Sequence, residues 1–506
     1  MNRRDFLKAT GSAALLAGLP LPALAVNPAV DDWAAAFHQA MKTRPWLAGW
    51  AGQTGDRAVP ALMAEGRLPP GLNGTYYRNG PAGHEIAGLR YRHWFDADGM
   101  VHAWKLGPEG ASWRCRFVDT QKRAREQAAG RALVPAFGTV PEGASTIPMP
   151  DTINPANINA LPHAGKLLAL WEAGSAYELD PETLETKGVV TWREDLKGVA
   201  FSAHPKVEPD GTLWNFGVNY IDGRMILWRV NPDGTLHTAA EIPGARHLGF
   251  LHDMAVTERS LVFLLSPVML SRPRFLMGNS FLDSLDWEPE RGTIILAVDK
   301  DDFSRQRRWQ LPASFGFHFG NAWEEADGTI RFDYALADDA SVLFDTLRHV
   351  MRGALVPPTA LPRETMVTLS PNGRSRVEAL GPELAEFPRV DPRVVGRRNR
   401  QIYHLARTVE REMPLFNAVI RRDLETGTAD AFDYGPDTLA EEHVFVPRPG
   451  GAGETDGWVV GTALDVRRGA TGVNVFDARR LADGPVMRAW LPFPVPLGLH
   501  GNFHLG

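Results

Sequence analysis

The sequence contains a single cysteine, Cys115, among 506 residues. One cysteine cannot form an intramolecular disulfide, and it excludes a cysteine-rich zinc or iron–sulfur site. Any metal ion bound by this chain must therefore be held by histidines or carboxylates. An excess of positive charge is also lacking, since 54 Lys and Arg face 60 Asp and Glu, for a net charge of −6. Nucleic acid is not expected as a partner, because phosphates need clustered positive charge.

Beyond the N-terminal segment, long apolar runs are absent, so no membrane-spanning helix is expected. Residues 3–8 (RRDFLK) are similar to a twin-arginine export motif. A short apolar stretch follows, and Ala23-Leu24-Ala25 has the form of a cleavage site. Residues 1–25 are therefore predicted to be a twin-arginine signal peptide, and residues 26–506 a single domain in the periplasm.

The remaining chain has the pattern of β structure. Its 49 glycines and 39 prolines indicate many turns. Asp-Gly and Asn-Gly pairs recur, for example at 210–211 and 327–328, and they supply the positive φ that tight hairpins need. A strand-like run followed by a polar turn residue occurs seven times at irregular spacing, as in an all-β propeller with insertions on one face, with a generic β protein as the alternative. The long segments 268–290 and 335–361 are expected to form a helical and loop cap over one face.

Four of the 15 histidines share one kind of surroundings. Each lies at the end of an apolar strand-like run, beside small or turn-forming residues. They are His204, His252, His318 and His500. A propeller gathers the strand ends of different blades around one axis, so these four distant side chains are candidates for a shared metal site.

These four segments, together with residues 72–81 (LNGTYYRNGP), 94–102 (WFDADGMVH) and 168–174 (LALWEAG), resemble the carotenoid cleavage oxygenase family. The family includes the lignostilbene dioxygenases and the retinal isomerohydrolase, and the resemblance covers nearly the whole mature chain. It implies a capped seven-bladed propeller with Fe(II) on its axis, bound by His204, His252, His318 and His500. Imidazole suits iron, and four neutral ligands leave open positions for O₂.

The resemblance also implies three glutamates that hold the histidines from behind. A metal-bound histidine usually donates its other N–H to a carboxylate, which fixes its tautomer and direction. By local pattern these carboxylates are Glu172, Glu386 and Glu442, with Glu441 as an alternative to Glu442. The family usually has proline after the third glutamate, where this chain has His443.

Other residues of these segments are interpreted more simply. His102 and His163 are read as structural, because the ligand set is already filled. Asp253, next to His252, is expected to make a hydrogen bond that supports the fold. Ile158 matches a family segment near the unliganded side of the iron, where it would form an apolar wall beside the O₂ position. No catalytic residue beyond the metal ligands is predicted.

The resemblance implies cleavage of a conjugated C=C bond by O₂ to two carbonyl products. An apolar carotenoid or apocarotenoid is the expected substrate, with a stilbene-cleaving enzyme or a non-cleaving isomerase or binding relative as alternatives. Stilbene enzymes hold the substrate phenol with a tyrosine and a lysine. Trp113 matches the tyrosine position, and no lysine lies between Lys122 and Lys166, which favours the polyene. The apolar part of segment 268–290 is either a peripheral membrane contact or an internal packing face.

Overall fold

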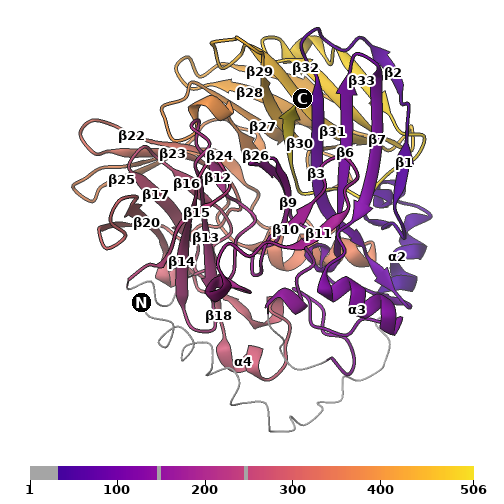
Figure 1. The fold of residues 1–506 in the computed structure, drawn as a ribbon, viewed down its shortest axis with the longest axis horizontal. Coiled ribbons are helices and arrows are strands. Elements are labelled where there is room, and N and C mark those ends of the chain that lie inside the picture. The colour runs from indigo at the N-terminus through magenta and orange to yellow at the C-terminus, as the bar shows by residue number, and fades with distance from the viewer. Residues whose placement is uncertain (1–31, 145–149, 244–248) are drawn as a thin grey trace.

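A computed structural model describes residues 32–144, 150–243 and 249–506 (Figure 1). The predicted signal peptide lies outside the described residues. Seven antiparallel sheets of four or five strands are arranged around the middle of the molecule. The predicted seven-bladed propeller is therefore confirmed.

The blades, numbered I to VII around the ring, share one plan in which the outermost strand is given first and the innermost last. Blade I consists of β1 (Arg57–Val59), β7 (Gly110–Phe117), β6 (Asp98–Gly107), β3 (Gly74–Gly83) and β34 (His500–Leu505). Blade II consists of β11 (Thr186–Val189), β10 (Tyr177–Leu179), β9 (Lys166–Leu170) and β8 (Asn159–His163). Blade III consists of β15 (Leu236–Glu241), β14 (Arg224–Val230), β13 (Leu213–Asn219) and β12 (Lys206–Val207).

The other four blades repeat this order. Blade IV consists of β21 (Gln306–Leu311), β20 (Thr293–Asp299), β17 (Ser260–Leu265) and β16 (Met254–Val256). Blade V consists of β25 (Ser375–Ala379), β24 (Arg363–Leu369), β23 (Ile330–Leu336) and β22 (Phe319–Glu324). Blade VI consists of β29 (Ala429–Asp433), β28 (Ala418–Asp423), β27 (Gln401–Arg407) and β26 (Leu384–Arg389). Blade VII consists of β2 (Met63–Gly66), β33 (Met487–Trp490), β32 (Ala470–Asp477), β31 (Gly457–Asp465) and β30 (Thr438–Pro447).

Two pairings between distant parts of the chain close the ring. The late strand β34 pairs with β3 in blade I, from Gly74 opposite Leu505 to Asn79 opposite His500. The early strand β2 pairs with β33 in blade VII. Because each of these sheets combines early and late strands, the ring closes with two hydrogen-bonded ladders. His500 thereby takes the innermost position of blade I.

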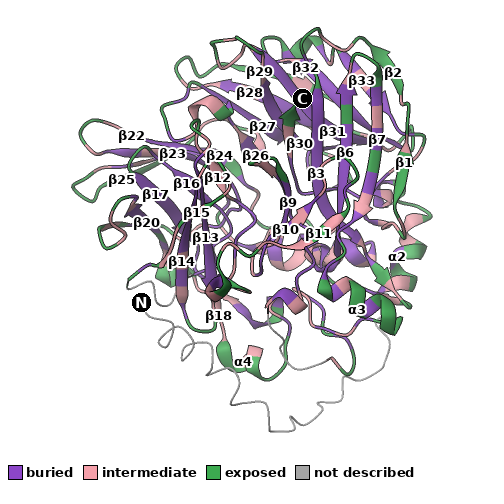
Figure 2. Ribbon diagram, viewed as in Figure 1, coloured by how far each residue is buried: buried purple, intermediate pink, exposed green. Residues whose placement is uncertain are grey.

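The hairpin turns follow from the local sequence. Gly211 and Gly328 adopt φ values of 90° and 85° in the turns before β13 and β23. These positive values are accessible to glycine without steric cost, as the Asp-Gly pairs predict. Alternating buried and half-buried positions along strands such as β14 place apolar side chains between neighbouring blades. Figure 2 shows this as buried strands bordered by exposed turns.

The helices gather along one side of the sheets in Figure 1. They include α2 (Trp33–Met41), α3 (Gln121–Ala129), α4 (Arg272–Leu276) and α5 (Leu347–His349), with the 3₁₀ segments η2 (Pro45–Trp50) and η9 (Val350–Arg352), the π-helical segment η8 (Val342–Thr346) and the small hairpins β4 (Glu85–Ile86)–β5 (Leu89–Arg90) and β18 (Val268–Leu270)–β19 (Leu285–Trp287). Further 3₁₀ turns are η3 (Trp94–Asp96), η4 (Pro150–Thr152), η5 (Glu194–Leu196), η6 (Leu282–Ser284), η7 (Pro289–Arg291), η10 (Pro392–Val394) and η11 (Leu481–Asp483).

The predicted segments 268–290 and 335–361 contribute α4, η8, α5 and η9 to this cap, and α2 and α3, from outside those segments, join them. Helix α2 begins after Asp32, whose carboxylate accepts the Ala35 N–H at 2.9 Å and so caps the helix. It buries Trp33 and Phe37 in a core cluster that also contains Phe317, beside the axis. The cap and the axis therefore share one apolar core, which shields the centre of the propeller from water.

Candidate metal centre

Four buried histidines meet on the propeller axis. His204 and His252 each lie two residues before the innermost strands of blades III and IV, and His318 lies one residue before that of blade V. His500 is the first residue of β34 in blade I. One ring nitrogen from each lies within 4.8 Å of the others, and all four side chains are buried. The structure thus brings together all four histidines singled out in the sequence.

The three predicted glutamates stand behind three of these rings. His318 Nδ1 lies 2.5 Å from Glu386 Oε2, and His500 Nδ1 lies 3.1 Å from Glu442 Oε1. His252 Nδ1 contacts Glu172 Oε1 in the same way. Since each carboxylate accepts the Nδ1 proton, the Nε2 lone pair of each ring is directed away from its glutamate and into the centre. The Nε2 atoms of His252 and His318 lie 3.3 Å apart there.

Every blade contributes one of these seven groups. The histidines come from blades I, III, IV and V, while the glutamates come from blades II, VI and VII. Glu172 lies in the turn after β9, Glu386 in β26 and Glu442 in β30. The centre is therefore built from side chains that the ring alone brings together.

Strand irregularities aim several of these side chains. The pairing register shifts between Glu386 and Arg389 in β26, and between Ala440 and His443 in β30. Such bulges turn a side chain away from its regular face of the sheet. Phe387, within the first of them, has φ 56° and stacks its ring 4.9 Å from that of His318. Backbone strain at a non-glycine residue is thus located directly beside the centre.

Glu441 and Glu442 are neighbours with different partners. Glu442 also accepts the Gly501 N–H at 2.7 Å through its second oxygen. Glu441 forms a buried ion pair with Arg78 and accepts the Gly498 N–H at 2.6 Å. The structure therefore places Glu442 behind His500, whereas Glu441 anchors the segment that leads into β34.

The electrostatics of the site match metal binding. Burial, together with the nearby histidines, lowers the pKa of His204 and of His318 well below the usual value. Neutral imidazoles are the form that binds a metal ion. Burial raises the pKa of Glu386 to about 8, so a cation at the centre would favour the charged carboxylate that accepts the His318 proton. Burial also opposes ionisation of Glu442, but Arg389 and His500 outweigh it and lower the pKa of that carboxyl to about 2.

The donor set fits a divalent transition metal. The Nε2 of His204 is buried and has no hydrogen-bond partner among the described residues. A buried polar atom of this kind calls for a partner, and a metal ion bound also to the other three rings would provide one. Four imidazole nitrogens without thiolate are typical ligands for iron and similar metals.

Two further predicted residues have contrasting positions. The Ile158 carbonyl accepts the His500 N–H at 3.2 Å, so Ile158 lies beside the centre. Trp113 lies in β7, which is separated from the innermost strand of blade I by β3 and β6. Three strand spacings amount to roughly 14 Å. Trp113 packs between blades I and VII, and the structure does not bring it to the histidines.

Sequence reasoning missed two aromatic neighbours of the centre. The Phe317 ring lies 5.1 Å from that of His252, and Phe387 covers His318. Phe317 adjoins a predicted ligand, so proximity in the sequence could have identified it. Phe387 follows Glu386 directly, but its direction depends on a left-handed backbone that the residue type disfavours.

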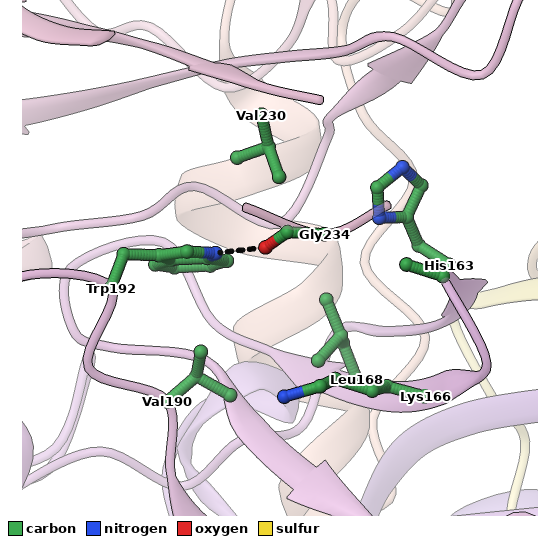
Figure 3. A pocket seen from close by; sticks show the side chains of 8 residues that line it. His163, Lys166, Leu168, Val190, Trp192, Val230 and Gly234 are labelled. Atoms are coloured by element: carbon green, nitrogen blue, oxygen red, sulfur yellow. Dashed lines mark hydrogen bonds between the residues drawn. The ribbon is translucent and has the colours of Figure 1, made fainter. Parts of the chain in front are cut away.

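The interpretation of His163 as a structural residue agrees with its contacts. Its Nε2 lies 3.0 Å from the Gly211 carbonyl oxygen, and it is not one of the four histidines that converge. It lines a small pocket with Lys166, Trp192 and Gly234, shown in Figure 3. With a volume of about 20 Å³, this pocket has room for little more than one water molecule and none for a polyene.

Comparison with known proteins places this architecture in a family. Residues 52–505 match the family model RPE65, described as retinal pigment epithelial membrane protein. An apocarotenoid-15,15'-oxygenase of Synechocystis sp. is 30% identical over 491 residues, which cover 90% of this chain and 96% of that protein. A lignostilbene-alpha,beta-dioxygenase isozyme III of Sphingomonas paucimobilis is 30% identical over 468 residues, covering 87% and 93%.

Solved structures agree with these relatives. A variant of the Synechocystis apocarotenoid oxygenase has a TM-score of 0.83 at 29% identity, covering 92% of this chain and 99% of that one. A cobalt-substituted form of the same oxygenase has a TM-score of 0.81 at 28% identity, with the same coverage. The fold and the four-histidine centre thus define a propeller oxygenase. The chain belongs to the RPE65, or carotenoid oxygenase, family, as its sequence motifs predict.

Proposed function

We propose that this protein is a non-haem Fe(II) dioxygenase that cleaves a conjugated C=C bond of a carotenoid or apocarotenoid with O₂. The observation that carries the proposal is the buried set of four histidines, three of them held by glutamates. One oxygen atom would add to each carbon of the cleaved bond, giving two carbonyl products. Both electron pairs of the cleaved C=C bond reduce O₂ to the two carbonyl oxygens, so no external reductant is needed.

The protein's own residues would prepare the site for this chemistry. Fe(II) bound by the four histidines would supply the redox chemistry that activates O₂. Glu172, Glu386 and Glu442 hold the ring tautomers, so that no reorganisation is needed when a metal binds. The apolar Phe317 and Phe387 rings beside the histidines keep water away from the reacting bond.

A series of aromatic rings supports an apolar substrate. From Phe317 the ring centroids continue to Phe95 at 6.2 Å, to Phe137 at 5.8 Å, to Phe281 at 5.7 Å and to Phe275 at 6.2 Å. Phe275 belongs to α4 at the edge of the cap. An extended polyene that approached the centre along these rings would meet apolar surface over its length.

We also propose that α4 contacts the membrane surface from which a lipid-soluble substrate is collected. Leu276 and Met277 are 46% and 58% exposed, and Arg272 lies on the same short segment. Exposed apolar side chains with nearby positive charge suit an anionic lipid surface. Among the described residues, no helix is long and apolar enough to cross a membrane. The double change Leu276→Ser and Met277→Ser should reduce sedimentation with anionic vesicles, whereas Val377→Ser, in an exposed blade edge, should not.

Export by the twin-arginine route to the periplasm is part of the same proposal. The RRDFLK motif and the cleavage site at residue 25 support it. N-terminal sequencing of protein from a periplasmic extract tests it. A mature chain beginning near residue 26 is expected, and retention of residue 1 in the cytoplasm would contradict it.

Stilbene cleavage is a second candidate, because the Sphingomonas relative is as similar as the Synechocystis one. The position of Trp113 removes one argument against it, since that side chain does not face the centre. The apolar ring series does not discriminate between the two substrates, since both would present apolar surface to it. The distinction therefore depends on products.

The test is product mass spectrometry in ¹⁸O₂. Leaderless protein loaded with Fe(II) is incubated with an apocarotenal and, separately, with a hydroxystilbene, and His318→Ala protein serves as the control. Labelled aldehydes from the polyene alone support the main proposal, and labelled benzaldehydes support stilbene cleavage. If the iron-loaded protein yields an isomer without label, both cleavage proposals are wrong and the protein is a non-cleaving member of the family.

A further inference from the structure

His204, His252 and His318 lie just before the innermost strands of three successive blades. The innermost strands of blades III, IV and V share no backbone ladder in the described chain. Strand β12 has two residues and β16 has three, so neither is long enough to fix its own position firmly. Side chains must therefore set the distances between His204, His252 and His318.

One carboxylate, that of Asp253, contacts all three of these strands. Its Oδ2 accepts the N–H of Phe319, the residue after His318, at 2.9 Å. Lys206 Nζ, on β12 two residues after His204, lies 2.9 Å from Oδ1 and 3.1 Å from Oδ2. Oδ1 also accepts the Met254 N–H of its own strand at 2.7 Å. The Asp253 side chain is only 1% exposed.

The same carboxylate is the acid nearest to the histidine that lacks a glutamate. In the described chain, His204 has no carboxylate within hydrogen-bond distance, but its Nδ1 lies 3.9 Å from Asp253 Oδ1. A buried negative charge at this distance attracts a proton on Nδ1. It therefore favours the tautomer whose Nε2 lone pair is available at the centre.

We propose that Asp253 is a positioning residue for the metal centre. It fixes the spacing of His204, His252 and His318, and it orients His204 in place of a glutamate. The inference rests on the proposed metal-binding function and extends the simple fold-supporting role expected from the sequence. An interaction that served the fold alone would not change how tightly, or in what geometry, the folded protein binds a metal.

The variant that tests this is Asp253→Asn. Asparagine has nearly the same shape, but its single amide oxygen can accept from only one of the Phe319 and Met254 N–H groups, and it carries no charge to pair with Lys206. The matched control is Asp391→Asn, since Asp391 is equally buried and holds a cation, Arg393, within its own turn. Lys206→Gln serves as a second, milder variant that keeps the carboxylate and removes its counter-charge.

The measurement is titration of the purified metal-free proteins with CoCl₂, followed by the visible d–d absorption of Co(II). The cobalt-substituted relative shows that this probe suits the fold. We expect the Kd of Asp253→Asn for Co(II) to be about 10- to 100-fold higher than that of the wild-type protein, and its d–d bands to shift. Lys206→Gln should give a smaller change in the same direction, and Asp391→Asn should match wild type. Circular dichroism and Tm of the metal-free forms show that folded proteins are compared.

The outcomes distinguish failure of the positioning role of Asp253 from failure of the proposed metal-binding function. Wild-type-like affinity and spectrum in Asp253→Asn, even with a lowered Tm, would overturn the positioning role and leave the proposed function intact. If Asp253→Asn fails to fold, wild-type-like Co(II) binding by Lys206→Gln overturns it. If the wild-type protein itself binds no Co(II), both the proposed metal centre and this inference fall.

Discussion

The two sides of the four-histidine centre are held in place by different means. His500 stands at the start of a six-residue strand that pairs along its length with β3. His204 and His252 precede strands of two and three residues whose sheets do not pair with each other. On the first side the backbone register fixes the ligand, and on the second a buried carboxylate bridges the gap. Sheet pairing sets positions within a blade, whereas the Asp253 carboxylate joins the innermost strands of blades III, IV and V across the gaps between their sheets.

Glu441 and Glu442 also differ in what they hold in place. Glu442 lies behind a histidine, while Glu441 ties the approach to β34 to Arg78 of β3. One residue therefore acts on a histidine of the centre and its neighbour acts on ring closure. Changes at these positions should affect different measurements.

The largest effect is expected from removing a ligand. His318→Ala should abolish metal binding and oxygenase activity, because three rings and no fourth nitrogen remain, while the propeller stays largely folded. Metal content by mass spectrometry and far-UV circular dichroism check both parts. His163→Ala is the control and should retain metal, since the His163 ring contacts the Gly211 carbonyl and does not belong to the four-histidine cluster. Full activity in iron-analysed His318→Ala protein would contradict the assignment of this ligand.

The second-largest effect is expected from Glu441→Gln, and it should lower the stability of the protein without changing its metal affinity. Glu441→Gln leaves Arg78 buried without its carboxylate, and such a loss costs roughly 3–5 kcal/mol. Urea unfolding should show this decrease in the free energy of unfolding, while Co(II) affinity of the folded protein stays near wild type. A loss of affinity with unchanged stability would reverse the roles given to Glu441 and Glu442.

A moderate effect on the centre is expected from Glu172→Gln. The neutral amide oxygen is a weaker acceptor for the His252 Nδ1–H than the carboxylate is. Metal affinity or rate should therefore fall about 10- to 100-fold. Parallel Fe(II) titration and kcat measurements check this. Glu178→Gln is the matched control, since Glu178 is half-buried like Glu172 in the same blade but pairs with Lys166, and it should have no effect on either quantity.

The smallest effect is expected at Trp113. Its indole N–H has no hydrogen-bond partner among the described residues, so Trp113→Phe should lose only packing, about 1–2 kcal/mol of stability. The ratio of polyene to stilbene cleavage should not change, because the side chain lies on the fourth strand from the axis. A changed product ratio would show that the interior of blade I is coupled to substrate choice.

The positions that could be predicted from the sequence are those whose chemistry depends on residue type. Histidines and glutamates in recognisable segments identified His252 and Glu172, and Asp-Gly turns indicated hairpins such as the one containing Gly328. The distance of Trp113 from the axis could not be predicted in this way. It depends on β34 taking the innermost place in blade I, which moves every other strand of that sheet one position outward.

The aim of Phe387 and the bridge made by Asp253 were also beyond sequence reasoning. Phe387 depends on a strained φ inside a bulge, which its residue type argues against. The partners of Asp253 lie on three sheets, and their meeting depends on the angles between blades. Local pattern identifies which groups can act, but the closed ring decides which groups meet.

Because each of the seven blades supplies one group to the centre, the molecule is modular in shape but not in composition. Propellers as an architecture tolerate different blade numbers. In this chain the deletion, duplication or exchange of any blade would remove one specific histidine or glutamate, or insert a gap between two of them. A circular permutant that opened the ring at an exposed turn would keep all seven. Recombination between relatives can therefore succeed at the level of loops and termini, while the number and order of blades are fixed by the chemistry at the axis.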